Sequence, residues 1–313
     1  MAFAFIFPGQ GSQFIGMGKA FADAFPSARA VFEEVNDALG EGLSKLIWDG
    51  DETELKQTAN TQPALMAVSV ATMRALEEAK GIKAEQAAYV AGHSLGEYSA
   101  LTAAGSLAVS DCARLLRLRG QAMQAAVPEG QGAMAALLGA TPEQAEALCL
   151  AGRSLGVCET ANDNAPGQIV ISGDKAAVEA AISGAKEAGV KKAVLLPVSA
   201  PFHCSLMQPA KDAMAEALAD VDLSAPSVPL VANVTAQPTS DPDAIREQLI
   251  TQVTGQVRWT ESVTYMANQG VIHLVEAGAG KVLTVMNRRT VKGLVGLNLN
   301  APEDLETVTE ALG

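Results

Sequence analysis

Short apolar runs alternate along the chain with longer stretches in which apolar residues recur every three or four positions. The short runs are typical of buried strands, and the longer stretches are typical of amphipathic helices. The expected strands are Ala2–Phe7, Ala88–Gly92, Val228–Val234, Val271–Glu276 and Leu294–Leu299. The expected helices include Ser27–Leu39, Pro63–Ala79, Asp111–Ala126 and about Leu206–Leu218. This alternation predicts an α/β fold in which helices cover a parallel sheet.

The order and length of the expected elements change between Gly130 and Ser199. The expected elements there are, in order, a strand at Ala133–Leu138, a helix at Pro142–Leu150, strands at Val157–Asn162 and Gln168–Ser172, a helix at Lys175–Ala188 and a strand at Lys192–Val198. The order βαββαβ is typical of a small ferredoxin-like unit. We therefore predict that residues 130–199 form a small subdomain inserted into a large, discontinuous α/β catalytic domain of residues 1–129 and 200–313.

Composition and charge narrow the class of protein. The 313 residues are 49% apolar and 18% charged, which is enough apolar material for a sizeable core. The net charge of −13 predicts that neither nucleic acid nor an anionic membrane is the main partner. No apolar run reaches the roughly 20 residues of a membrane span, and the apolar start lacks the basic leader of a signal peptide. We therefore expect a cytoplasmic protein.

Cysteines and histidines are few and dispersed. The four cysteines are Cys112, Cys149, Cys158 and Cys204, and no two of them are spaced as Cys-x-x-Cys. This predicts reduced thiols and no metal site. The segments Gly9-Gln10-Gly11 and Gly278-Ala279-Gly280-Lys281 lack the remaining residues of a dinucleotide loop and a phosphate loop respectively, so neither predicts a nucleotide cofactor.

The pattern Gly-x-Ser-x-Gly occurs twice, around Ser94 and around Ser154. A nucleophile elbow needs a strand before the serine and a helix after it. Ser94 has both, because Ala88–Gly92 is an expected strand and the residues from Glu97 onward favour a helix. Ser154 has the reverse arrangement, which predicts a structural turn. Ser94 is therefore the candidate nucleophile, and the alternative at this position is a tight turn with a capping serine.

A serine nucleophile needs a base, and the chain has three histidines. His93 adjoins Ser94 on the turn, so its side chain is expected to point away. His273 lies in an apolar strand, where a hydrogen-bonded core histidine is favoured. His203 lies in a loop before a helix, where the imidazole can stay neutral. His203 is therefore the candidate base, with a locally packed loop histidine as the alternative.

Arg119 lies on the apolar stripe of its helix, four residues after Leu115 and three before Ala122. An inward guanidinium needs an anion, because its charge is not titrated away. That anion is either an internal carboxylate or the carboxylate of a substrate. The second option would select a dicarboxylic half-acid such as malonyl.

Five segments occur together in the order that a known family has them. They are Phe7-Pro8-Gly9-Gln10-Gly11-Ser12-Gln13, Asn60-Thr61-Gln62-Pro63-Ala64, Gly92-His93-Ser94-Leu95-Gly96-Glu97-Tyr98, Arg117-Leu118-Arg119-Gly120 and Glu276-Ala277-Gly278-Ala279-Gly280. Along essentially the whole chain, these segments resemble the malonyl-CoA:acyl-carrier-protein transacylases of fatty acid and polyketide synthesis. Gln256, where many members have proline, and Phe202, where many stand-alone bacterial members have serine, depart from the common pattern.

The resemblance implies an α/β-hydrolase-like parallel-sheet core that carries an inserted ferredoxin-like subdomain. It implies a malonyl-Ser94 ester, formed from malonyl-CoA and discharged to the phosphopantetheine thiol of acyl carrier protein. By motif alignment His203 matches the base and Arg119 the residue that binds the malonyl carboxylate. Gln10 and Leu95 match the backbone N–H donors of the oxyanion hole, and Gln252 matches the backbone carbonyl that orients the base.

The resemblance also implies coenzyme A thioester as substrate, with no permanently bound cofactor and no metal, and we expect a monomer. Three alternatives stay open: a serine hydrolase or thioesterase on the same elbow, an acyltransferase for another acyl-CoA such as methylmalonyl-CoA, and a non-catalytic protein with the same fold. Because the expected carrier protein is acidic, we predict a basic patch near the mouth of the cleft, with Lys191, Lys192, Arg288 and Arg289 as its candidates.

Overall fold

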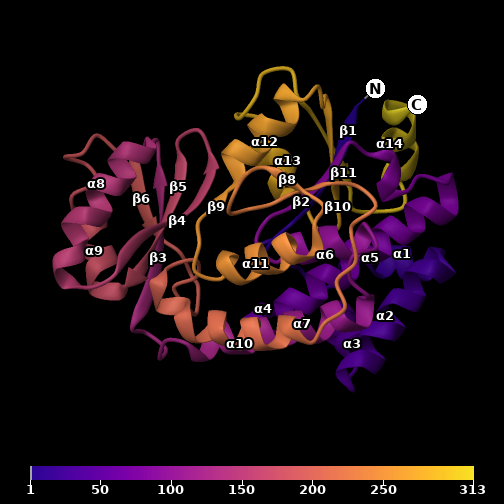
Figure 1. Cartoon of the computed structure of the whole chain (residues 1–313), viewed down its shortest axis with the longest axis horizontal. Helices are drawn as coiled ribbons and strands as arrows, with labels where there is room; N and C mark the ends of the chain where they lie inside the picture. Colours follow the sequence, from indigo (N-terminus) through magenta and orange to yellow (C-terminus); the bar gives the residue numbers. More distant parts are fainter. Residues whose placement is uncertain (1) are drawn as a thin grey trace.

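The computed structural model describes residues 2–313. Figure 1 shows a large unit beside a smaller one, with the two chain termini close together at the edge of the large unit. The elements between Gly132 and Leu195 build the small unit, and the elements before and after them build the large one. Among the described residues, no helix is both long and apolar enough to cross a membrane.

A six-stranded sheet lies in the large unit, in the order β11-β10-β1-β2-β7-β8. Its strands are β1 Phe3–Phe7, β2 Tyr89–Gly92, β7 Leu230–Val231, β8 Pro238–Thr239, β10 His273–Ala277 and β11 Val295–Leu299. All neighbours are parallel except β7 and β8, which are antiparallel. The fold is therefore α/β, as predicted, but the sheet is mixed rather than wholly parallel.

Helices surround this sheet. They are α1 Lys19–Ala24, α2 Pro26–Leu39, α3 Leu43–Asp49, α4 Glu52–Lys56, α5 Thr58–Lys80, α6 Gly96–Ala103, α7 Val109–Ala125, α10 Gln208–Ala219, α11 Pro242–Gln252, α12 Trp259–Asn268, α13 Val282–Asn287 and α14 Asp304–Leu312. Short 3₁₀ turns lie at η1 Ala84–Gln86, η2 Arg153–Leu155 and η3 Ser205–Met207. Buried residues occur on every side of α5, because this helix is enclosed between its neighbours.

The start of α5 differs from the prediction. The helix begins at Thr58, so Pro63 lies inside it rather than in the first turn. The turn before the proline is held from outside, because Thr61 Oγ1 donates to Leu55 O at 2.6 Å. Gly120 of α7 packs directly on this turn, and a Cβ on that glycine would lie 2.6 Å from the carbonyl oxygen of Thr58. The turn before the proline is therefore packed against a neighbouring helix and bonded to the preceding segment.

The predicted strand at Val228–Val234 is also shorter in the structure, where β7 covers Leu230–Val231. The chain leaves the sheet because Asn233 turns toward the neighbouring strand. Asn233 Nδ2 donates to Gly92 O at 2.7 Å, and Asn233 Oδ1 accepts from the backbone N–H of Ser94 at 2.8 Å. A segment predicted to extend the sheet therefore holds the turn after β2.

The small unit contains β3 Gly132–Leu138, α8 Pro142–Gly152, β4 Cys158–Ala165, β5 Gln168–Asp174, α9 Lys175–Ser183 and β6 Lys192–Leu195, in the predicted βαββαβ order. Its strands lie in the order β6-β3-β5-β4, and all these neighbours are antiparallel. A two-residue strand from the large unit, β9 Val257–Arg258, adds to the edge in parallel with β4. Two elements are shorter than predicted, since α9 ends at Ser183 and β6 ends at Leu195.

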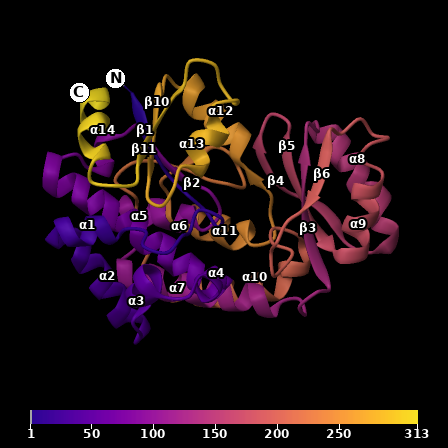
Figure 2. The ribbon, with the colours of Figure 1, turned by 180° about the vertical axis from the view of Figure 1, so that it is seen from behind.

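The two faces of the small sheet have different partners, because side chains alternate along a strand. Ala135 and Leu137 belong to the core that the sheet forms with α8 and α9. Met134 and Ala136, which alternate with them along the strand, pack with the core of the large unit. Both helices cover the outer side of the small unit, which leaves the other face of its sheet toward the large unit (Figure 2).

Candidate active site

Ser94 stands on a sharp turn between β2 and α6, with φ at 53°. Both glycines of the pattern are required by close backbone contacts. A Cβ on Gly92 would lie 1.9 Å from the backbone of Gly96, and a Cβ on Gly96 would lie 2.3 Å from Phe7 O. Strand, turn and helix therefore follow one another as a nucleophile elbow requires.

Ser154, in the second copy of the pattern, lies in the 3₁₀ turn between α8 and β4 and is exposed. Its hydroxyl donates to the nearby Ala151 O at 3.4 Å. The helix thus comes before this serine and the strand after it, as predicted, and Ser154 has no place in the site.

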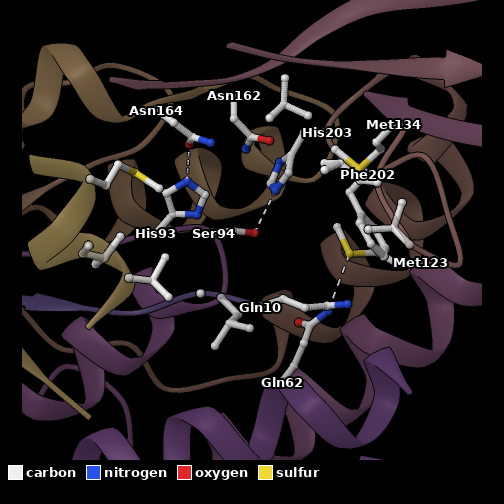
Figure 3. Close-up of a pocket in the computed structure, with 18 of the residues that line it drawn as sticks. Gln10, Gln62, His93, Ser94, Met123, Met134, Asn162, Asn164, Phe202 and His203 are labelled. Atoms are coloured by element: carbon white, nitrogen blue, oxygen red, sulfur yellow. Dashed lines mark hydrogen bonds between the residues drawn. The ribbon is translucent and has the colours of Figure 1, made fainter. Parts of the chain in front are cut away.

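His203 lies across from the nucleophile, and its Nε2 is 2.7 Å from Ser94 Oγ (Figure 3). Its Nδ1 faces two carbonyl oxygens, Gln252 O at 2.9 Å and Gly255 O at 3.1 Å. Carbonyl oxygens only accept, so the proton belongs on Nδ1 and the lone pair on Nε2 faces the serine hydroxyl. This arrangement suits a general base, and it includes the backbone contact predicted for Gln252.

Burial, followed by the positive charge of Arg119, lowers the pKa of His203 to about 3. The imidazole is therefore neutral in the resting site, as a base must be. Among residues 2–313, Ser94, His203 and Ala236 are the non-glycine residues with positive φ. Two of these three belong to the site, and a strained backbone of this kind persists where the surrounding structure enforces it.

Arg119 is 1% exposed and faces the nucleophile from α7. Its Nη1 donates to Gln62 Oε1 at 2.7 Å, and its Nη2 donates to Gln252 Oε1 at 2.8 Å and to Ser94 Oγ at 3.2 Å. Within residues 2–313, no carboxylate lies within 4.0 Å of this guanidinium. Of the two partners considered from the sequence, an internal carboxylate in direct contact is therefore excluded.

Gln10 and Leu95 both line the cavity around Ser94. Gln10 comes from the loop after β1, and Leu95 follows the nucleophile at the start of α6. In the described part of the chain, neither backbone N–H donates to a protein acceptor. Two unused donors beside the nucleophile can stabilise the oxyanion that forms when a carbonyl is attacked.

The other two histidines differ partly from expectation. His93 makes no contact with the Ser94 hydroxyl, but its side chain lines the cavity wall, where Nε2 is 2.8 Å from Asn164 Oδ1. His273 is buried in β10 as predicted, yet its Nδ1 has no hydrogen-bond partner among the described residues. Neither ring contacts the nucleophile, because the strand direction and the turn orient both elsewhere.

The cavity has a volume of about 190 Å³ and lies between the two units. Its wall is mostly apolar and contains residues from both units, namely Met123, Met134, Val170, Leu196, Val198, Phe202, Val282, Leu283 and Met286. Figure 3 shows Met134 and Phe202 beside His203, with Gln62 on the opposite side of the nucleophile. A cavity with a mostly apolar wall and a few polar groups is typical of a site for a small molecule.

Sequence reasoning missed the roles of Gln62, Glu97 and Asn233. Gln62 and Glu97 stand inside recognised motifs, so their positions carried a signal, but their contacts with Arg119 and Gln252 cross long stretches of chain. Nothing in the sequence pattern pointed to a role for Asn233 in the site, because it was assigned to a strand.

Among residues 2–313, no group of three or more histidine, cysteine, aspartate or glutamate side chains is arranged to hold a metal ion.

Known proteins of one family match this chain along nearly its whole length. A family model described as the acyl transferase domain matches residues 4–308. The malonyl CoA-acyl carrier protein transacylase of Escherichia coli (strain K12) is 46% identical over 308 residues, which cover 98% of this chain and 99% of that protein. The acyl-carrier-protein-S-malonyltransferase of Bartonella henselae superposes with a TM-score of 0.97 at 53% identity, covering 100% of both chains.

A third similar protein was solved as a complex, described as a type II PKS acyl-carrier protein with its malonyl-transacylase. It is 43% identical, with a TM-score of 0.96, and covers 99% of this chain and 100% of that one. These matches agree with the motifs and with the geometry around Ser94. The chain therefore belongs to the acyl transferase domain family.

Proposed function

We propose that this protein transfers a malonyl group from coenzyme A to the phosphopantetheine thiol of acyl carrier protein through an ester on Ser94. In the first half, Ser94 Oγ attacks the thioester carbonyl while His203 Nε2 takes the hydroxyl proton. The N–H groups of Gln10 and Leu95 stabilise the oxyanion. When the C–S bond breaks, the coenzyme A sulfur leaves with the proton from His203, so that malonyl-Ser94 remains.

The second half reverses these roles. The carrier thiol gives its proton to His203 and attacks the Ser94 ester carbonyl. The C–O bond to the serine breaks, and Ser94 Oγ recovers the proton from His203. No water enters either half, and the apolar wall around the ester supports transfer to a thiol rather than hydrolysis.

The single observation that carries this proposal is the contact of Arg119 with Ser94 Oγ at 3.2 Å. A buried guanidinium within reach of the nucleophile, held by neutral partners, is poised for a substrate carboxylate. An acyl group with a carboxylate two bonds from its carbonyl, such as malonyl, satisfies this charge. The names of the Escherichia coli and Bartonella henselae relatives support the same substrate and carrier.

We also propose that the large unit is an α/β-hydrolase-like core of residues 1–129 and 200–313, and that residues 130–199 form a ferredoxin-like subdomain. The antiparallel order β6-β3-β5-β4 and the βαββαβ sequence support the second assignment. The elbow at the end of β2 supports the first. In this arrangement the large unit supplies the nucleophile, and the small unit supplies one wall of the cavity.

The proposal predicts that the protein forms a stable adduct when it is mixed with malonyl-CoA. Intact mass spectrometry should show the addition of one malonyl group, and carrier protein bearing phosphopantetheine should remove it and become malonylated. The control is apo carrier protein, which lacks the thiol and should leave the adduct in place. If free malonate accumulates while the protein stays unlabelled, the hydrolase alternative is correct instead.

Of the four basic residues predicted for the carrier, Lys192 and Arg289 lie near one surface hollow beside the main cavity. All four, Lys191, Lys192, Arg288 and Arg289, are exposed. Leu138 pairs with Lys192 on one side and with Gln168 on the other. Gln168 lines a surface hollow together with Lys281 and Arg289, and this hollow shares Val282 and Met286 with the main cavity. These positions support a docking surface for an acidic carrier. Lys281 is a further member of this surface.

Charge reversal on this surface should weaken carrier recognition selectively. In Lys192→Glu/Arg289→Glu we expect the KM for carrier protein to rise by about tenfold or more, because two favourable charge contacts become repulsive. The KM for malonyl-CoA should stay unchanged in steady-state kinetics. Lys45→Glu on α3, an exposed site in the large unit away from the small one, is the matched control (Figure 1). Equal changes in both KM values, or no change, would contradict this surface.

A further inference from the structure

Glu97 is a buried carboxylate that takes no part in the reaction proposed above. It lies in the first turn of α6, three residues after the nucleophile, and is 0% exposed. Its Oε2 accepts from Gln252 Nε2 at 2.5 Å and from the backbone N–H of Asn233 at 3.4 Å, while its Oε1 has no partner in the described structure. Burial of an ionisable group costs free energy, so its place beside the nucleophile indicates a function.

The side chain of Gln252 joins Glu97 to Arg119. Its Nε2 donates to Glu97 and also to Ser94 O at 3.0 Å, and its Oε1 accepts from Arg119 Nη2. The opposite orientation of the amide would place its NH₂ group against the guanidinium donors and its oxygen against two acceptors. The acceptor oxygen of Glu97 and the donor nitrogen of Arg119 therefore determine which way this amide points. The same residue, through its backbone carbonyl, contacts the base His203.

Arg119 keeps its charge available because its partners are neutral. Apart from Ser94, the guanidinium donates to the side-chain oxygens of Gln62 and Gln252, and it lies 5.7 Å from the ring centre of Tyr98. A carboxylate in direct contact would neutralise it and would compete with a substrate carboxylate. Glu97 is linked to the same guanidinium through one amide, so it fixes the acceptor that Gln252 presents to Arg119 without occupying the donors of the guanidinium.

We infer that Glu97 is a positioning residue for carboxylate recognition, which acts through the Gln252 amide to hold Arg119 at Ser94. This inference rests on the proposed function, because it concerns selection of a malonyl over an acetyl donor. Without the carboxylate, the Gln252 amide loses its shortest hydrogen bond, so the acceptor that it presents to Arg119 is held less firmly. Loading of an acyl group that lacks a carboxylate does not depend on that acceptor.

The test compares Ser94 loading by malonyl-CoA and by acetyl-CoA in wild type and Glu97→Gln. We expect the ratio of kcat/KM for malonyl-CoA to that for acetyl-CoA to fall by about tenfold or more, since hydrogen bonds to a charged group are affected. The loss should come from malonyl-CoA alone. Gln252→Met, which keeps the backbone carbonyl and removes the amide, should lower the ratio in the same direction. It also decides the question if Glu97→Gln does not fold.

Glu276→Gln is the matched control. Glu276 is also a fully buried glutamate, but its oxygens accept from the backbone N–H groups of Leu283 and Thr284 at the start of α13, away from Arg119. It should lower the temperature of unfolding and leave the ratio unchanged. An unchanged ratio in a folded Glu97→Gln or Gln252→Met, or equal losses with both donors, would overturn the inference. Failure of the wild type to form any malonyl adduct would instead refute the proposed function.

Discussion

Ser94→Ala is expected to eliminate the malonyl adduct and to lower malonyl transfer to carrier protein by at least about 10⁴-fold. The reason is that no other hydroxyl or thiol replaces Ser94 Oγ, the atom 2.7 Å from the base His203. Binding of coenzyme A thioester should persist, because the cavity wall and the Gln10 and Leu95 amides are unchanged. Intact mass after incubation with malonyl-CoA, together with transfer to labelled carrier protein, measures both effects.

The second copy of the pattern provides the control for this substitution. Ser154→Ala changes a serine with the same Gly-x-Ser-x-Gly neighbours, but on an exposed turn outside the cavity. It should form the malonyl adduct at the wild-type rate. An adduct of unchanged mass and rate in Ser94→Ala would mean that another side chain carries the acyl group.

Arg119→Ala is expected to lower loading from malonyl-CoA by about 10²–10³-fold, because the buried partner of the substrate carboxylate is removed. Loading from acetyl-CoA should increase, since the variant no longer buries a cation that an acetyl group leaves unpaired. The two rates of Ser94 acylation, measured by rapid quench and intact mass, give the change in selectivity.

Arg117→Ala is the matched control for Arg119→Ala, two residues away on the same helix. Arg117 pairs with Glu41 and Asn60 outside the cavity, so this change should leave the preference for malonyl-CoA intact. If Arg119→Ala reduces loading from both donors alike, the guanidinium supports the site structurally and does not bind the carboxylate of the substrate.

Local pattern predicted much of the architecture. The strands β1, β2, β10 and β11 and the six elements of the small unit occur where periodicity placed them, within a few residues. The errors at α5 and β7 have a similar origin. The first turn of α5 packs against Gly120 of α7, and Asn233, just after the short β7, contacts Gly92 and Ser94. Both are contacts between segments far apart in sequence, which local periodicity does not report.

Some features of the site were likewise predictable from the sequence, and others were not. Spacing alone indicated Ser94 as the nucleophile and Arg119 as an inward charge, and the resemblance to a family added Gln10, Leu95 and Gln252. The structure brings Ser94, Arg119, His203, Gln10 and Leu95 to one cavity, and Gln252 contacts both Arg119 and His203. The side-chain role of Gln252 and the buried carboxylate of Glu97 could not be foreseen, because both depend on which amide atom faces which charge.

The sequence by itself determined the alternation of strands and helices, the elbow with its two required glycines, and which side chains are the candidates for the reaction. These follow from local sterics and from the chemistry of single residues. Tertiary structure alone decided that Arg119 has neutral partners, that His203 is held by carbonyl oxygens, and that the two units enclose the cavity between them. The reason is that burial and hydrogen-bond partners are properties of residues brought together from distant parts of the chain.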